Sequence, residues 1–279
     1  MAASLDSYVV MGNPIAHSKS PQIHALFAQQ TGQEMHYGTL LVAQDSFARA
    51  VSDFVASGGK GFNITVPFKQ EAWALADARS ERAEFAGAVN TIVVRDNGTL
   101  YGDNTDGVGM VRDIVVNHGC AIQGKRVLVL GAGGAVRGVL GPLLAEIPAS
   151  VTVANRTVAR AVELAELFKR QGTISACGFD ELAGEQFDLV INGTSASLKG
   201  ELPPLPEDML AKDAWCYDMM YGAEPTPFLR WAQLHGAAHS LDGLGMLVEQ
   251  AAEAFYLWRG VRPQTLPVIK ALRDTLLAK

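Results

Sequence analysis

A glycine-rich loop after a strongly apolar segment constrains the fold more than any other feature of this 279-residue chain. Arg126–Leu130 (RVLVL) is an apolar run of the kind expected in a strand that is buried on both faces. Gly131-Ala132-Gly133-Gly134-Ala135 follows it directly and precedes a helical pattern. A strand, a glycine loop and a helix in this order are the context in which a dinucleotide pyrophosphate binds at a helix N-terminus. The loop therefore predicts an α/β domain that binds a dinucleotide.

The loop departs from the strict fingerprint, because Val136 stands where the third glycine is expected. In the cofactor interpretation, Gly131 allows the tight turn and Gly133 lets backbone N–H groups approach the pyrophosphate. The alternative is a tight strand–helix turn that binds nothing. The helix that runs to about Glu146 and the next strand, Val151–Ala154, favour the cofactor site.

The end of that next strand indicates which dinucleotide binds. NAD enzymes commonly place Asp or Glu about 20 residues past the loop, where it binds the ribose diol. This chain has Asn155-Arg156-Thr157 there, with Arg160 one turn later. Guanidinium groups attract a 2′-phosphate that a carboxylate would repel. We therefore expect NADP(H), with ordinary surface arginines beside an N-cap threonine as the alternative.

Strands alternate with helices along the chain, and the regular alternation in its second half predicts parallel βαβ units. The length suits two domains. We expect an N-terminal α/β substrate-binding catalytic domain over residues 1–106, completed by 243–279. Residues 107–242 would form a Rossmann-type parallel-sheet NADP domain. The C-terminal helical segment is expected to return to the first domain.

Periodicity and turn signals place individual elements in both domains. The expected strands are Ser7–Gly12, His36–Val42, Gly61–Val66, Val89–Arg95, Phe187–Ile191 and Trp215–Met219, and the expected helices are Ser20 to about Gly32, Asp45–Ser57, Pro67 to about Phe85, Val108–Asn117 and Thr157–Arg170.

Composition narrows the possible partners. The chain has 23 Lys and Arg against 29 Asp and Glu, a net charge of −6, which argues against nucleic acid as the main partner. The three cysteines lie far apart in the sequence, which argues against a disulfide framework or a thiolate zinc site. The N-terminus lacks a signal-peptide pattern, and Arg137, Pro142 and several glycines interrupt the apolar stretch Val127–Ile147. A cytoplasmic, soluble protein with a small-molecule substrate is expected, and a homodimer is left open.

One segment is similar to a calcium-binding loop. Asn104-Thr105-Asp106-Gly107, taken with Asp113, follows part of that pattern. Gly102 stands at the first ligand position, however, and has no side-chain oxygen. We therefore expect no metal site.

Several short motifs, of which those in the first domain are unusually polar, occur in an informative order along the chain. They are GNPIAHSKSP at 12–21, NITVPFK at 63–69, AVNT at 88–91, GDNTDG at 102–107, YDMMY at 217–221 and GLGMLVEQ at 243–250. Together with the glycine loop, they resemble the shikimate dehydrogenases, and the resemblance covers nearly the whole chain.

The resemblance implies reversible, NADPH-dependent reduction of 3-dehydroshikimate to shikimate, in chorismate and aromatic amino acid biosynthesis. By the family pattern, Ser18 and Ser20 would bind the substrate carboxylate with Tyr221, the ring hydroxyls would bind Thr65, Asn90, Asp106 and Gln250, and Lys69 would be the catalytic acid/base beside Asp106. The residues that would line the cofactor site are Gly131, Ala132, Gly133, Gly134, Ala135, Asn155, Arg156, Thr157, Arg160, Met219 and Gly243, with Glu81 as an acidic contact.

The residues themselves suit this chemistry. Ser18 and Ser20 flank a helix start, where N–H groups favour an anion, although Ser20 could also be simply the N-cap. Asn63 and Thr65 share one face of a strand. A charged Lys69 can donate a proton to an alkoxide that forms as hydride arrives, and Asp106 can hold the ammonium in place. Taken alone, a lysine at such a position is more often a solvated surface charge.

Two alternative functions are left open. One is a quinate/shikimate dehydrogenase that uses NAD, which Asn155-Arg156-Thr157 argues against. The other is a non-catalytic NADP-binding module, which Lys69, Asp106 and the two serines argue against, because a module that only binds NADP needs no acid/base pair.

Overall fold

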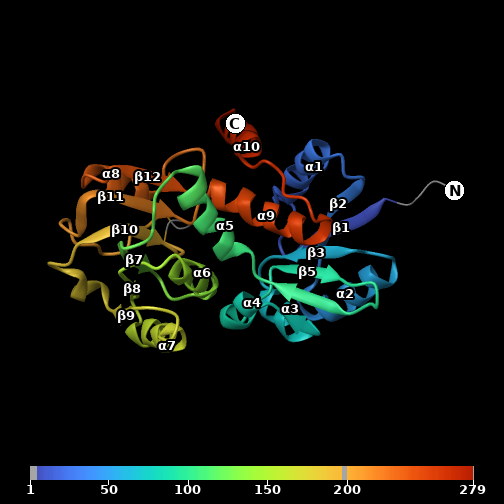
Figure 1. Ribbon diagram of the computed structural model, residues 1–279, viewed down its shortest axis with the longest axis horizontal. Coiled ribbons are helices and arrows are strands. Elements are labelled where there is room, and N and C mark those ends of the chain that lie inside the picture. The colour runs from blue at the N-terminus through green and yellow to red at the C-terminus, as the bar shows by residue number, and fades with distance from the viewer. Residues whose placement is uncertain (1–4, 197–199, 279) are drawn as a thin grey trace. The chain divides into compact units, whose positions relative to one another are not determined.

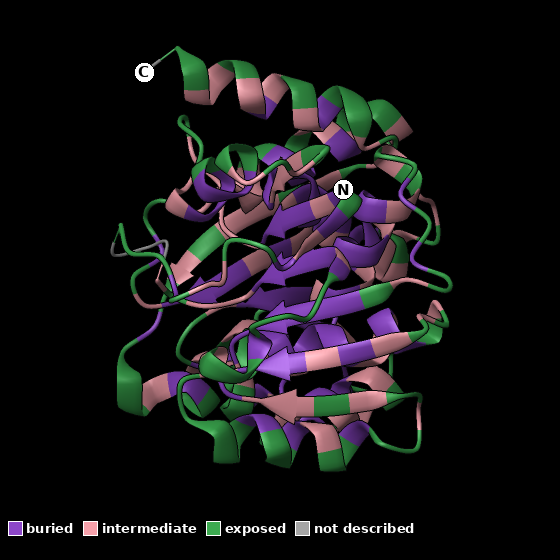
Figure 2. Cartoon of the chain, turned by 90° about the vertical axis from the view of Figure 1, so that its left-hand side faces the viewer, coloured by how far each residue is buried: buried purple, intermediate pink, exposed green. Residues whose placement is uncertain are grey.

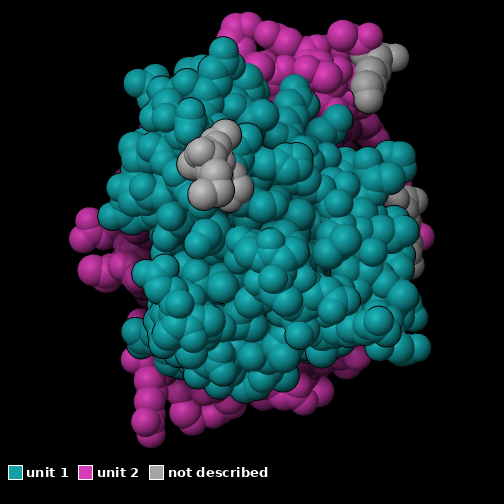
Figure 3. All heavy atoms as spheres, turned by 90° about the vertical axis from the view of Figure 1, so that its right-hand side faces the viewer, with its two compact units in different colours: residues 1–109, 248–268 teal, residues 110–247, 269–279 magenta. Residues whose placement is uncertain are grey.

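The structure is a computed structural model that describes residues 5–196 and 200–278 (Figure 1). The chain divides into two compact units, coloured separately in Figure 3. The first unit comprises Met1–Gly109 and Val248–Val268, and the second comprises Met110–Leu247 and Ile269–Lys279. The C-terminal stretch is therefore shared between the two units.

The first unit is built on a six-stranded mixed sheet with the order β2-β1-β3-β5-β6-β4. Its strands are β1 (Asp6–Gly12), β2 (Met35–Leu41), β3 (Gly61–Ile64), β4 (Ala78–Arg79), β5 (Thr91–Val94) and β6 (Leu100–Asp103), and its helices include α1 (Ser20–Thr31), the short 3-10 turn η1 (Gln44–Ser46), α2 (Phe47–Ala56), α3 (Lys69–Leu75) and α4 (Glu81–Ala86). Strands β2, β1 and β3 run parallel, whereas β5 is antiparallel to β3 and to β6. The helix expected from Pro67 to Phe85 is interrupted by β4, because Ala78 and Arg79 pair with β6.

Apolar side chains from alternate strand positions form the core on one side of this sheet. Met11, Phe62 and Ile92 pack there with aromatic residues from the helical segments. The rings of Phe47 and Phe68 stack at a centroid distance of 5.0 Å. This core fixes α2 and the start of α3 against the sheet, which places the residues at the carboxyl end of β3.

An aromatic cluster in the same unit joins α9 (Leu244–Arg259) to the N-terminal strands. The buried ring of His24 stacks on Tyr37 at 4.1 Å and lies 5.4 Å from Trp258 of α9. Trp258 Nε1 donates a hydrogen bond to the carbonyl oxygen of Ile92 at 2.9 Å. Gly61 makes this contact possible, because a Cβ at this position would lie only 2.4 Å from Trp258 Nε1.

The second unit contains a fully parallel six-stranded sheet with the order β12-β11-β10-β7-β8-β9. Its strands are β7 (Arg126–Leu130), β8 (Ser150–Ala154), β9 (Ile174–Cys177), β10 (Phe187–Asn192), β11 (Leu210–Asp218) and β12 (His239–Asp242), and its helices include α6 (Gly134–Ala145), α7 (Val158–Phe168), the short turn η3 (Phe179–Leu182) and α8 (Pro227–Leu234). Figure 2 shows the central strands buried and the outer faces of the helices exposed. The strand order is that of the doubly wound dinucleotide fold, which reverses between β7 and β10.

Three helices carry residues of both units. They are α5 (Asp106–Arg112), which continues as the π-helical turn η2 (Asp113–Asn117), α9, and α10 (Leu266–Leu277). The final part of α10 is bound to the second unit, because Arg273 donates to Gly222 O at 2.9 Å and to Asp242 Oδ1 at 2.5 Å. Within the part of the chain that is described, no helix combines the length and the apolarity that crossing a bilayer requires.

The close approach at Gly61 gives a stability prediction. We expect Gly61→Ala to lower the free energy of unfolding by about 1–3 kcal/mol, because the added methyl group overpacks a filled site. Gly38→Ala in β2 is the matched control, since its Cβ would meet nothing closer than 3.5 Å. Urea unfolding of both variants measures the difference. Equal losses of stability in the two variants would contradict the packing argument.

Candidate active site

Lys69 and Asp106 lie together at the ends of two strands of the first unit. Lys69 is the first residue of α3, shortly after β3, and Asp106 is the first residue of α5, shortly after β6. Lys69 Nζ donates to Asp106 Oδ2 at 2.6 Å, with side-chain exposures of 30% and 18%. The pair is thus half-buried: it is shielded enough for a strong interaction, and it remains open to a ligand.

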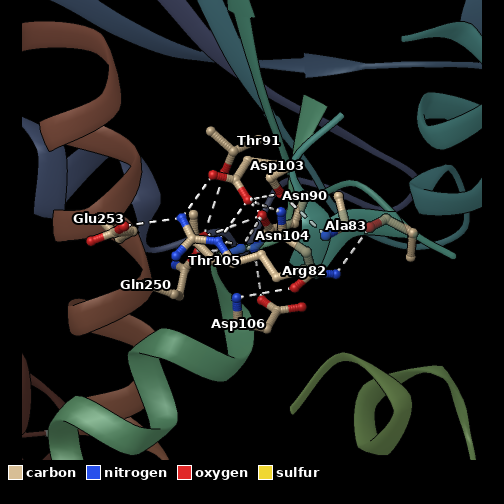
Figure 4. A network of polar contacts seen from close by, with 12 residues as sticks. Arg82, Ala83, Asn90, Thr91, Asp103, Asn104, Thr105, Asp106, Gln250 and Glu253 are labelled. Carbon is tan, nitrogen blue, oxygen red and sulfur yellow. Dashed lines mark hydrogen bonds and ion pairs between the residues drawn. The ribbon is translucent and has the colours of Figure 1, made fainter. Parts of the chain in front are cut away.

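The second oxygen of Asp106 is bound by a buried asparagine. Asn90 Nδ2 donates to Asp106 Oδ1 at 2.8 Å and to Thr105 Oγ1 at 2.9 Å (Figure 4). Asn90 Oδ1 accepts from the backbone N–H of Thr105 at 2.9 Å. Gln250 Oε1 on α9 lies 3.5 Å from Asn90 Nδ2. Four residues that the sequence placed in the site, Lys69, Asn90, Asp106 and Gln250, therefore form one cluster.

The cluster extends through Asn63 to a residue that sequence reasoning missed. Asn63 Nδ2 donates to Asn90 O at 3.1 Å and to Thr91 Oγ1 at 2.9 Å. Asn63 Oδ1 accepts from the hydroxyl of Tyr37 at 2.7 Å. Burial raises the pKa of Tyr37 and keeps this hydroxyl protonated. No sequence signal marks Tyr37, because it lies on β2 and meets Asn63 only through the folded sheet.

The serine segment lies at the start of α1. The helix begins at Ser20, with Lys19 at the N-cap position and no side-chain cap, so the expected N-cap role of Ser20 is wrong. Instead, Ser18 Oγ accepts from the backbone N–H of Ser20 at 3.3 Å. Both serines are partly exposed, so their hydroxyl groups are accessible to a ligand.

Thr65 is positioned by a glycine. A Cβ at Gly12 would lie 2.4 Å from Thr65 Cγ2. The backbone N–H of Thr65 donates to Met11 O at 3.0 Å, and its carbonyl oxygen accepts from Phe68 N at 3.1 Å. Gly12 is therefore a second residue that sequence reasoning gave no role, and its presence at the start of the GNPIAHSKSP segment was the available signal.

In the second unit, the glycine loop lies where the strand order reverses. Gly131 has φ of +102° and donates to Ala154 O at 2.8 Å. Ala132 and Gly133 follow, Gly133 is the N-cap residue of α6, and Gly134 and Ala135 form the first turn of that helix. A Cβ at Gly133 or Gly134 would meet nothing within 4 Å, so space for a ligand lies directly over these backbone groups. This opening fits a dinucleotide pyrophosphate.

Val136 packs against another glycine. It is fully buried, and a Cβ at Gly193 would lie 2.4 Å from Val136 Cγ2. The bulk of Val136 thus occupies space that Gly193 leaves empty, and the helix start keeps its form without the third fingerprint glycine.

The remaining cofactor candidates lie at two further places. Asn155, Arg156, Thr157 and Arg160 follow β8, where Asn155 Nδ2 donates to Thr157 O at 2.9 Å and both arginines are exposed. Met219 and Gly243 lie in contact, because a Cβ at position 243 would lie 2.3 Å from Met219 O.

Two predicted residues belong to a different compact unit from the other members of their predicted groups. Tyr221 belongs to the second unit and is partly buried, and burial raises the pKa of its hydroxyl. Glu81 belongs to the first unit, where it is the exposed first residue of α4.

Within residues 5–196 and 200–278, no group of three or more His, Cys, Asp or Glu side chains is arranged to hold a metal ion.

The chain matches three family models over most of its length. The models are described as the shikimate dehydrogenase substrate binding domain, matched by residues 10–92, shikimate / quinate 5-dehydrogenase, matched by 114–199, and the shikimate 5'-dehydrogenase C-terminal domain, matched by 243–273.

Relatives match along the whole chain as well. A protein named shikimate dehydrogenase (NADP(+)) from Alkalilimnicola ehrlichii is 66% identical over 96% of this chain and 98% of its own length. A crystal structure of an Ael1 enzyme from Pseudomonas putida has a TM-score of 0.91 and 48% identity, covering 96% of this chain and 98% of that one. Shikimate 5-dehydrogenase from Thermus thermophilus in complex with NADP(H) and shikimate has a TM-score of 0.85 and 32% identity, covering 98% of this chain and 100% of that one.

The buried His24 of α1 gives a pH prediction. Burial lowers the pKa of this imidazole to about 3, whereas an unfolded histidine titrates near 6.5. Because the unfolded chain binds the extra proton, stability is lost as the pH falls from about 6.5 towards 3. As the pH falls, the free energy of unfolding should decrease more steeply in the wild type than in His24→Phe. The difference between the two slopes should reach up to ~1.4 kcal/mol per pH unit. Urea unfolding at several pH values measures both slopes, and parallel curves would contradict the assignment.

Proposed function

The chain belongs to the shikimate dehydrogenase family, and on that premise we propose that it catalyses the reversible, NADP-dependent reduction of 3-dehydroshikimate to shikimate. The cluster of Lys69, Asp106 and Asn90 is the observation that carries this proposal. Lys69 is a proton donor held in place by Asp106, and the carboxylate and amide groups around it can bind hydroxyl groups of a substrate. The reaction is that of an oxidoreductase acting on a secondary alcohol, and its product serves chorismate and aromatic amino acid biosynthesis.

We assign the substrate to the first unit. Ser18 and Ser20 present hydroxyl groups at the N-terminus of α1, where backbone N–H groups and the helix dipole stabilise a carboxylate. Thr65, Asn90, Asp106 and Gln250 supply hydroxyl, amide and carboxylate groups that bind the ring hydroxyls. Tyr221 of the second unit is proposed as a further contact to the carboxylate.

We assign NADP(H) to the second unit. The open backbone of Gly131–Ala135 fits the pyrophosphate, and Arg156 and Arg160 suit the 2′-phosphate. Met219 and Gly243 are proposed to line the nicotinamide end of the site, and Glu81 is a further proposed contact. When bound, NADPH supplies the hydride that reduces the carbonyl group.

Lys69 supplies the proton in this scheme. In the direction of reduction, its ammonium group donates a proton to the alkoxide oxygen of the substrate, and in oxidation the amine takes the hydroxyl proton back. Asp106 accepts a hydrogen bond from Nζ at 2.6 Å and so orients the ammonium group of the lysine. Asn90 in turn keeps the Asp106 carboxylate in one orientation, since it binds the other oxygen.

A cytoplasmic location is part of the proposal. Cys120, Cys177 and Cys216 form no disulfide, and Cys120 and Cys216 are buried. Free thiols of this kind are typical of a reducing compartment.

The proposed role of Lys69 predicts the kinetics of a variant. Lys69→Ala should lower kcat by about 10²–10⁴ with modest effects on KM, because a general acid is lost and binding groups remain. Lys60→Ala, which removes an exposed lysine of the same unit, is the control. The assay follows nicotinamide absorbance with shikimate and NADP⁺. Near-normal turnover by Lys69→Ala would exclude this role for the lysine.

The proposed phosphate contact predicts a change in cofactor preference. Arg156→Asp should weaken NADPH binding by about 10- to 100-fold, because a charge-assisted hydrogen bond is replaced by repulsion. NADH lacks the 2′-phosphate and should be affected little. Arg170→Asp, at an exposed position beyond α7, controls for the change in net charge. Titration of both cofactors by fluorescence measures the effect, and equal weakening of the two would refute the assignment.

A further inference from the structure

A line of charged side chains joins α4 to α9 within the first unit. Arg82 on α4 donates from Nε to Asp103 Oδ1 and from Nη2 to Asp103 Oδ2, each at 2.7 Å. The same Nη2 donates to Glu253 Oε1 on α9 at 3.0 Å. Arg262 binds the other oxygen of Glu253. Figure 4 shows Arg82 bonded both to Asp103 and to Glu253. One guanidinium group therefore connects a strand end to a helix that lies far away in the sequence.

At one end of this line, Asp103 makes hydrogen bonds that fix the segment leading to Asp106. Asp103 is only 2% exposed, and a carboxylate buried to this degree requires a paired cation. Asp103 Oδ1 also accepts from the backbone N–H of Asn104 at 2.7 Å. Asn104 Oδ1 then accepts from the backbone N–H of Asp106 at 3.2 Å. Arg82 thus neutralises the residue that begins the turn into α5.

At the other end of this line, the bond from Arg82 to Glu253 fixes α9, the helix that also carries Gln250. The two residues are three positions apart on α9, so they lie on one face of the helix. Gln250 Oε1 reaches Thr105 Oγ1 at 3.4 Å and Asn90 Nδ2 at 3.5 Å. These are long contacts, so a small displacement of α9 would break them.

We propose that Arg82 and Glu253 are positioning residues that hold Gln250 against Asn90 and Thr105, and so set the geometry in which the ring hydroxyls are bound. This inference rests on the proposed function, in which Gln250 is a substrate contact. Arg82 itself touches neither Lys69 nor Asp106 through any of the bonds described above. Its effect on catalysis therefore passes through the placement of Gln250 relative to the β6–α5 turn.

A double-mutant cycle tests the proposal. Glu253→Leu removes the acceptor for Arg82 and should raise KM for shikimate by about 5- to 20-fold, with kcat changed little. In a Gln250→Ala background the same substitution should raise KM no further, because the group it positions is absent. Glu253→Gln keeps an oxygen at that place and should retain most of the affinity. KM for NADP⁺ should stay the same in every variant.

Two further variants secure the interpretation. Arg82→Lys leaves a cation beside Asp103 but loses the planar fork that binds both oxygens of Asp103 and reaches Glu253. It should therefore raise KM for shikimate, even if Glu253→Leu does not fold. Arg259→Gln breaks the ion pair that the last residue of α9 makes with Asp6, and should lower thermal stability without changing KM.

The outcomes separate the inference from the function it rests on. If the wild-type protein oxidises shikimate and the Glu253→Leu and Gln250→Ala effects on KM simply multiply, the positioning role is wrong and the proposed function stands. The same holds if Arg82→Lys leaves KM unchanged. If the wild-type protein does not oxidise shikimate with NADP⁺, the proposed function fails and the inference fails with it.

Discussion

The candidate site depends on a single carboxylate that is bound at both oxygens. Asp106 accepts from Lys69 on one side and from Asn90 on the other. Asn90 is itself fixed, because its oxygen accepts from the backbone of Thr105 and its amide group donates to Thr105 and Asp106. A buried amide whose bonds are all satisfied has one stable orientation. The ammonium group of Lys69 is therefore presented in one place, as proton transfer to a bound ligand requires.

Much of this arrangement follows from local sequence patterns. The apolar run of β7 and the glycines after it predicted the strand, the turn and the start of α6, because each depends on residues close together in the chain. Lys69 and Asp106 could be paired in advance because the family pattern named both. The short strands β9 and β12 escaped notice, since four-residue, partly exposed segments at sheet edges carry almost no periodic signal.

Contacts between distant segments could not be predicted. Tyr37 on β2 contacts Asn63 on β3 across β1, which lies between these two strands in the sheet. Arg82 contacts Glu253, which lies 171 positions later in the sequence. Ser20 was offered as the N-cap of α1, whereas Lys19 occupies that position, because a serine before a proline has the same pattern whether it caps the helix or begins it. In each case, packing of the whole unit decides the outcome, and no short segment contains the information.

The contact between Val136 and Gly193 has an evolutionary consequence. A side chain at position 193 would collide with Cγ2 of Val136, while a smaller residue at 136 beside Gly193 would leave a void. A substitution at position 136 or at position 193 alone is therefore expected to be destabilising. A lineage that gains a methyl group at 193 must already have lost bulk at 136, so the order in which the two substitutions arise is constrained. Members of the family should fall into two matched combinations at these sites, with intermediate pairings rare.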